Sequence, residues 1–94
     1  MAAKRYKDQI LLQILQICQG IGASKTKVVY GSGLNFMTIK PYLATLSKSG
    51  LVEIVPGSHP LYRITKRGED ALVHLKALEE LIPEFAHVKK VETL

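Results

Sequence analysis

The chain has 94 residues, of which 47% are hydrophobic and 22% are charged. This length allows one domain and excludes enzymes built around a cleft between two domains. The composition is that of an ordinary globular protein and not of a disordered chain. No apolar stretch approaches the ~20 residues of a membrane-spanning helix, and glutamines interrupt the N-terminal segment where a secretory signal would be apolar. We therefore expect a cytoplasmic protein with no membrane partner.

The net charge of +5 is unevenly distributed along the chain. Residues 1–68 contain ten basic and two acidic side chains, whereas residues 69–94 contain three basic and six acidic ones. Between Asp8 and Glu53 there are four lysines and no acidic residue. A long stretch of one sign favours a polyanion as the binding partner.

The first predicted element is an amphipathic helix from about Tyr6 to Gln19, which Gly20 and Gly22 end. Its apolar residues recur at helical spacing, and glutamines occupy the opposite face. Leu12 lies at the edge of the apolar face. It either covers a neighbouring element, meets a partner chain or is a single exposed leucine.

Two further helices joined by a tight glycine turn are predicted next. Ser24 is placed to cap a helix over Lys25–Tyr30, which the sequence Gly31-Ser32-Gly33 is expected to stop. Asn35 is placed to cap a third helix over about Phe36–Ser49. Two helices in this arrangement form a helix-turn-helix.

The third helix has a predicted buried stripe formed by Ile39, Leu43 and Leu46, and Gly50 ends it. Pro41 lies inside this helix, where proline removes one backbone hydrogen bond and crowds the preceding turn. We expect either a kink at this position or a helix that begins late.

After the third helix the apolar period changes to two. Residues 51–55 and 61–65 predict a β-hairpin, and Pro56 and Pro60 stiffen its loop. Thr65 is placed to cap a last helix.

The last helix is predicted over about residues 66–90, with apolar residues that alternate between spacings of four and three. This seam is typical of a coiled coil and is longer than docking on a small domain requires. Pro83 is expected to bend or interrupt it. We therefore predict a homodimer, with contacts at Leu75, Leu78, Ile82 and Phe85.

The order of these elements indicates a mainly α fold with a small β-hairpin, a winged helix-turn-helix. Residues 1–94 are predicted to form a single domain. The helix-turn-helix spans about 24–49, the wing about 51–65 and the C-terminal dimerisation helix about 66–90.

Such a fold places its third helix in the DNA major groove. The exposed face of that helix carries threonine and lysine but no arginine, asparagine or glutamine, so we expect strong backbone binding with modest sequence discrimination. The competing interpretations are that the lysines only solvate the surface and that His59 is a turn residue without a role. The candidate DNA-binding residues are Lys25, Lys27, Thr38, Lys40, Thr45, Lys48, His59 and Arg63.

The sequence offers no catalytic constellation, and we expect neither an enzyme nor a cofactor. The single Cys18 has no cysteine partner for a disulfide or a metal site, which fits a reducing compartment. The histidines show no metal-ligand spacing. His74 and His87 fall on or beside the apolar seam, where histidines are usually structural; the alternative is that burial at a dimer contact makes association pH dependent.

Two stretches of the chain, Lys27–Asn35 and Tyr62–Gly68, carry a resemblance to a known family. With Tyr42-Leu43, Leu46 and Gly50-Leu51-Val52 between them, they resemble the small archaeal winged-helix transcriptional regulators, which include small crenarchaeal DNA-binding chromatin proteins. The resemblance covers roughly residues 7–75. It implies a homodimer, joined by an antiparallel coiled coil of the last helices, that binds double-stranded DNA through the third helix and the wing.

Three functional hypotheses follow. The first is a dimeric winged-helix protein that binds double-stranded DNA, as a transcriptional regulator or as a nucleoid-associated chromatin protein. The second is a winged-helix module for protein–protein interaction within a transcription assembly, supported by Leu12, the apolar seam and the weak base-reading face. The third is a repressor that responds to a small-molecule effector, whose pocket a sequence does not reveal.

Overall fold

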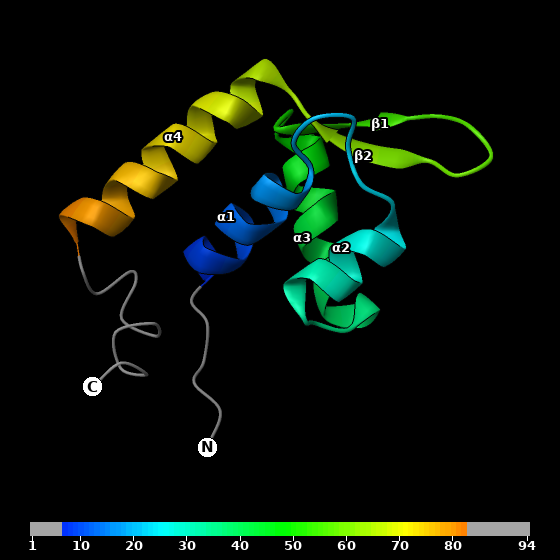
Figure 1. Ribbon diagram of the computed structural model, residues 1–94, viewed down its shortest axis with the longest axis horizontal. Coiled ribbons are helices and arrows are strands. Elements are labelled where there is room, and N and C mark those ends of the chain that lie inside the picture. The colour runs from blue at the N-terminus through cyan, green and yellow to red at the C-terminus, as the bar shows by residue number, and fades with distance from the viewer. Residues whose placement is uncertain (1–6, 83–94) are drawn as a thin grey trace.

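The computed structural model describes residues 7–82 and confirms the mainly helical fold with one small β-hairpin (Figure 1). None of the helices in this part of the chain combines the length and the apolar character that a bilayer crossing needs. The elements, in chain order, are α1 (Lys7–Ile17), α2 (Lys25–Ser32), α3 (Phe36–Lys48), β1 (Val52–Val55), β2 (Leu61–Ile64) and α4 (Lys66–Leu81).

Side-chain caps fix where three of the helices begin, as predicted. The hydroxyl of Ser24 accepts a hydrogen bond from the N–H of Lys27 (3.1 Å), and the Asn35 carbonyl oxygen Oδ1 accepts one from the N–H of Thr38 (2.9 Å). At the start of α4, Thr65 Oγ1 accepts a hydrogen bond from the N–H of Gly68 (3.0 Å). These bonds satisfy backbone donors that have no partner within the first turn of a helix.

The C-terminal end of α2 differs from the prediction. The helix was predicted to end at Tyr30, but it continues through Gly31 to Ser32. Gly33, the last residue of the predicted stop, caps it: its φ of 72° is left-handed, and its N–H donates to the Val29 carbonyl at 3.1 Å. Ser32 is buried and donates its hydroxyl to the same carbonyl at 3.2 Å. The helix therefore ends where the backbone becomes left-handed, and not at the first glycine of the turn.

Pro41 does not delay the start of α3. The helix begins at Phe36, directly after the Asn35 cap, and runs through Pro41 to Lys48. The late start allowed by the sequence is therefore wrong, because the cap fixes the first turn before the proline is reached. Ile39, Leu43 and Leu46 are buried, as predicted.

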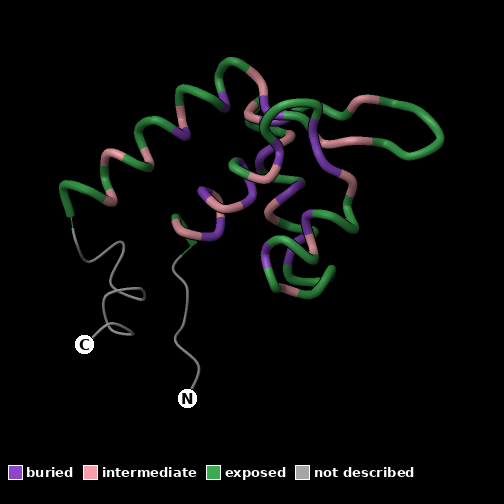
Figure 2. The backbone as a smooth tube through the Cα atoms, viewed as in Figure 1, coloured by how far each residue is buried: buried purple, intermediate pink, exposed green. Residues whose placement is uncertain are grey.

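The core lies where α1 meets the other helices and the base of the hairpin (Figure 2). Ile14 and Leu15 of α1 and Cys18 just after it are fully buried, and Val28 of α2 and Val52 of β1 belong to the same buried cluster. Their burial removes a continuous apolar surface from water, which is the main stabilising contribution in a domain of this size.

Leu12 is buried and not exposed. Only 6% of its surface is accessible, and it lines a small hollow together with Leu75 and Glu79 of α4. Of the three roles that the sequence left open, covering a neighbouring element is the one that the structure shows.

The strands β1 and β2 pair in antiparallel register, with Val52 opposite Ile64 and Ile54 opposite Tyr62. Val52 and Ile64 are buried at the base of the hairpin, whereas Ile54 is 51% exposed because the hairpin extends beyond the core. Ala23 adds a further pairing to β2 through two backbone hydrogen bonds with Tyr62, of 2.9 and 2.7 Å. This pairing attaches the loop after α1 to the wing.

The apolar seam of α4 divides between two surroundings. Leu72 is buried, and Ala71 and Leu75 pack against the core beside α1. Leu78 and Ile82 are 37% and 38% exposed, and Leu81 is 77% exposed. The first turns of the helix therefore pack against their own chain, and Leu78, Leu81 and Ile82 form an exposed apolar stripe at its end. Pro83, Phe85 and His87, which the predictions also named, lie outside the described residues.

Candidate nucleic-acid interface

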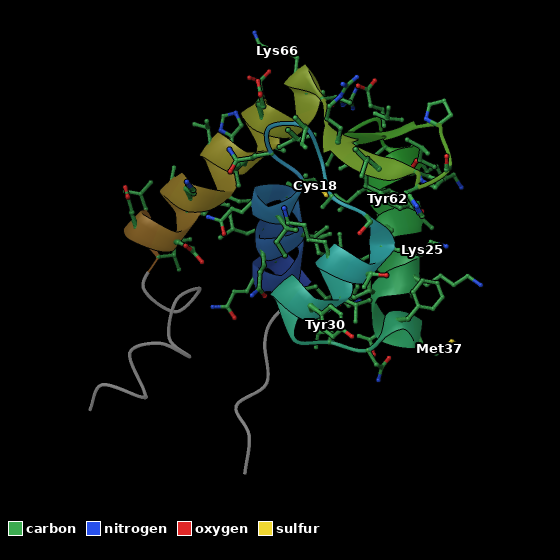
Figure 3. All side chains as sticks on the ribbon, turned by 45° about the vertical axis from the view of Figure 1, so that its right-hand side comes forward. Cys18, Lys25, Tyr30, Met37, Tyr62 and Lys66 are labelled. Carbon is green, nitrogen blue, oxygen red and sulfur yellow. The ribbon has the colours of Figure 1, made fainter. Side chains whose placement is uncertain are left out.

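A groove of about 450 Å³ lies between α3 and the wing. Three of its lining residues are lysines, and most of the others are apolar or aromatic. Lys25 and Tyr62 lie beside α3 on the same side of the molecule (Figure 3). The lining residues are Lys25, Phe36, Lys40, Leu43, Ala44, Ser47, Lys48, Ile54 and Tyr62.

Lys25 contacts α3 through its ammonium group. Its Nζ atom lies 5.1 Å from the centre of the Phe36 ring, which is a cation–π distance. The lysine belongs to the first turn of α2, where a cation is unfavourable next to the helix dipole. The Phe36 ring offsets part of that cost and holds the ammonium group at the edge of the groove.

Negative charge is directed away from this groove. Glu53 is the only acidic residue between positions 9 and 68, and its carboxylate binds Arg63, with Nη2 to Oε2 at 2.6 Å and Nε to Oε2 at 2.9 Å. Both residues lie on the face of the hairpin opposite to Ile54 and Tyr62, because successive strand residues alternate between faces. Within the described part of the chain, none of the residues lining the groove is acidic.

The remaining candidate residues are distributed around α3 and the wing. Thr45 lies on the other flank of α3, in a second hollow of about 440 Å³ shared with Lys7 and Pro41. Lys27 and Thr38 are exposed in the first turns of α2 and α3, and His59 is exposed in the loop of the hairpin. The structure thus gathers Lys25, Lys40 and Lys48 in one groove, places Thr45 apart from them and pairs Arg63 with a carboxylate.

Sequence reasoning missed the apolar part of the groove. Phe36 is 37% exposed and its ring faces Lys25, so it contributes to the groove and not to the buried stripe of α3. Ile54 and Tyr62 share the inner face of the hairpin with Val52 and Ile64. The alternation of side chains along a strand is enough to predict this shared face. What the alternation could not show is where the core stops beneath the hairpin.

Other chemistry is not evident in this part of the molecule. Across residues 7–82, no three His, Cys, Asp or Glu side chains come together as a metal site. Cys18 is fully buried, and burial raises the pKa of its thiol to about 11, so the group is neutral at physiological pH.

Comparison with known proteins places the fold. The profile of the winged helix-turn-helix family matches residues 4–83, which include every helix and strand described above. The chain belongs to the winged helix-turn-helix family. A sequence comparison with curated proteins gives no significant match.

Among solved structures, this winged-helix protein is similar to Sso10a-2, a DNA-binding protein from Sulfolobus solfataricus. The two chains are 25% identical and superpose with a TM-score of 0.78, over 95% of this chain and 94% of Sso10a-2. This similarity confirms the resemblance to the small archaeal winged-helix family that the sequence indicated.

Two bacterial structures share the fold at lower identity. The transcriptional regulator MosR from Mycobacterium tuberculosis is 20% identical, with a TM-score of 0.62 over 93% of this chain and 60% of its own. A protein of unknown function from Listeria innocua is 14% identical, with a TM-score of 0.66 over 89% of this chain and 71% of its own. The winged-helix protein therefore has a fold of the DNA-binding and transcription-regulator type.

Proposed function

We propose that this winged-helix protein binds double-stranded DNA as a homodimer, with α3 in the major groove and the wing on the flanking backbone. The observation that carries the proposal is the groove between α3 and the wing, which has lysines at its edge and no acidic lining residue among those described. Sso10a-2, which covers nearly the whole chain, is itself a DNA-binding protein. The role is binding and not catalysis.

The groove has the composition that a sugar–phosphate strand requires. Phosphates carry the charge that attracts Lys25, Lys40 and Lys48, and deoxyribose has apolar faces that suit Phe36 and Ile54. A helix in the major groove, which is ~12 Å wide, has a phosphate ridge on each side. We place one of these ridges in the groove between α3 and the wing, and the other on the opposite flank of α3, where Thr45 and Lys7 lie.

The second copy of the chain is placed on the distal turns of α4. Leu78, Leu81 and Ile82 form an apolar stripe at the end of a helix that extends away from the hairpin (Figure 1). Pairing of this stripe with its symmetry mate would bury it and leave both grooves free. A closed dimer of this kind presents two α3 helices to one duplex.

The proposed place of action is the nucleoid in the cytoplasm. The exposed face of α3 lacks the arginine, asparagine and glutamine that give bidentate base recognition, and this favours binding to many sites over one operator. A chromatin role and a regulatory role share the same contacts. They differ in the ratio of specific to non-specific affinity.

The structure removes one of the observations that supported the alternative hypothesis, a module for protein–protein interaction. Leu12 was to be part of an exposed docking surface, and it is buried against α4. The uncovered stripe of α4 remains, and a second copy of the chain accounts for it.

The test is a salt series of binding to a mixed-sequence duplex, followed by fluorescence anisotropy. Because Lys48 is proposed to contact a phosphate, Lys48→Ala should reduce the slope of log K against log salt concentration by about 0.9. Lys76→Ala is the matched control, since it removes the same charge from an exposed position on α4. Its slope should equal that of the unmodified protein.

Two results would count against the proposal. If the unmodified protein shows no binding at micromolar concentration in low salt, DNA is not its partner. If both variants change the slope equally, binding responds to net charge alone, and the groove is not the site.

A further inference from the structure

The exposed face of α3 carries a column of apolar side chains that reaches from the groove, which Ala44 lines, to the second hollow, which Pro41 lines. Met37 is 74% exposed, and Pro41 and Ala44 are exposed beyond it at spacings of four and three. Residues at these spacings share one helical face. The opposite face is fixed in the core by Ile39, Leu43 and Leu46.

This column occupies the part of α3 that would enter the major groove. Met37 lies in the first turn of the helix, at the edge of the molecule (Figure 3), and recognition helices contact bases chiefly through their N-terminal residues. Neither Met37, Pro41 nor Ala44 has a side-chain hydrogen-bonding group that can read an amide or a ring nitrogen. Contact with an apolar surface would remove the Met37 side chain from water, which is favourable.

The major groove offers one apolar group, the C5-methyl of thymine. We propose that Met37, Pro41 and Ala44 form an apolar reading face that packs against thymine methyl groups and gives the protein a preference for thymine-containing DNA. The inference rests on the proposed DNA binding and specifies what α3 recognises. The lysines on the flank of α3 bind the DNA backbone, and the apolar column distinguishes thymine from bases without a methyl group.

A substitution in the DNA isolates this contact. Replacing thymine by deoxyuridine removes only the C5-methyl and keeps every charge and every hydrogen-bonding group of the groove. We expect binding to an alternating adenine–uracil duplex to be at least about fourfold weaker than binding to the adenine–thymine duplex, the effect of burying about one methyl group. The complementary change, 5-methylcytosine for cytosine in a guanine–cytosine duplex, adds a methyl group at the same position and should strengthen binding.

A protein variant assigns the effect to the column. Met37→Gln keeps an unbranched side chain of similar length on an exposed helix position but removes its apolar end, so the ratio of thymine to uracil affinity should fall towards one. Ile21→Gln is the matched control, because Ile21 is also highly exposed, at 81%, and belongs to the loop after α1. It should keep the full ratio.

Each outcome distinguishes this inference from the proposed function. Equal affinity of the unmodified protein for the thymine and uracil duplexes overturns the apolar reading face while leaving DNA binding intact. A ratio that persists unchanged in Met37→Gln also overturns it, because the preference would then come from the stiffness of the duplex or from other residues. Failure to bind any of the duplexes at low salt overturns the proposed function instead.

Discussion

The guanidinium of Arg63 donates two hydrogen bonds to the same carboxylate oxygen of Glu53, at 2.6 and 2.9 Å, on the outer face of the wing. The pair couples the one acidic residue in this basic region to the one arginine of the hairpin. Both side chains are roughly half exposed, at 45% and 48%, so the pair contributes about 0–1 kcal/mol to stability. Its larger effect is on charge, since Arg63 is engaged before any DNA is present.

Glu53→Gln should therefore tighten DNA binding without changing the fold. It removes a negative charge near the duplex and releases Arg63 for a flanking phosphate, and we expect about threefold higher affinity at low salt. The free energy of unfolding should change by less than about 1 kcal/mol. Anisotropy titrations and urea unfolding measure the two quantities.

Adding Arg63→Ala to the Glu53→Gln variant tests the arginine directly, because the gain in affinity should then disappear. Weaker DNA binding by Glu53→Gln alone would mean that the wing needs the intact ion pair.

Thr65 joins the turn after α3 to the first turn of α4 through two hydrogen bonds. Its hydroxyl accepts a bond from the Gly68 N–H at 3.0 Å and donates one to the Gly50 carbonyl at 2.6 Å. Thr65→Val keeps the shape and removes both bonds, and we expect a loss of about 1–2 kcal/mol in the free energy of unfolding. Thr65→Ser keeps the hydroxyl and should stay within about 0.5 kcal/mol of the unmodified protein. Equal losses in the two variants would assign the effect to the methyl group.

Gly68 is required because the first turn of α4 lies directly against the segment between α3 and β1 and against the end of β2. A Cβ atom here would collide with the Leu51 carbonyl and lie 2.7 Å from Cγ1 of Ile64. Gly68→Ala should destabilise the protein by about 2–4 kcal/mol, although alanine favours a helix. Urea unfolding provides the measurement. Lys66→Ala, at an exposed position in the same turn, serves as the control and should change stability by less than about 0.5 kcal/mol.

Burial of Cys18 predicts both a chemical and a pH effect. Burial raises the pKa of the thiol to about 11 in the folded state, above the value of 9.0 for an exposed cysteine. Between pH 9.0 and pH 11 the native state therefore keeps a proton that the unfolded state has lost. The contribution of Cys18 to stability is therefore complete below pH 9.0 and declines towards pH 11. Subtracting the pH profile of Cys18→Ala isolates this contribution from lysines and tyrosines. A thiol reagent should label the protein rapidly only in denaturant, and rapid labelling of the native state would show that the thiol is accessible.

Local signals predicted the starts of the helices, because a cap is a relation between residues three positions apart. Ser24, Asn35 and Thr65 each accept the hydrogen bond that their position in the sequence indicated. The end of α2 was harder to predict, since three successive residues of a glycine turn are all compatible with a stop. Only the backbone conformation at Gly33 decides it.

Contacts between elements could not be predicted from the sequence. The hairpin was predicted, but the pairing of Arg63 with Glu53 and the exposure of Ile54 depend on strand register and on where the core ends beneath the sheet. The lysines of the groove were singled out from charge alone. Their assembly with Phe36 and Ile54 into one groove required the packing of α2, α3 and the wing.

The divided seam of α4 leads to the last prediction, which concerns the dimer. Leu75 packs against the core of its own chain, whereas Leu81 is 77% exposed. If the distal stripe joins two copies, Leu81→Gln should weaken self-association and leave the fold of each chain unchanged. Sedimentation velocity over a range of concentrations, with circular dichroism as the check on folding, should show a shift towards monomer.

Leu75→Ala is the informative comparison because Leu75 belongs to the same helix but packs against the core of its own chain. It removes apolar contacts within the chain, so we expect a loss of about 2–3 kcal/mol in the free energy of unfolding. In a dimeric protein, stability also depends on protein concentration, so both variants should be unfolded at several concentrations. Unchanged association in Leu81→Gln would exclude the distal stripe as the dimer contact. DNA binding by a stable monomer would separate the groove from the need for a second copy.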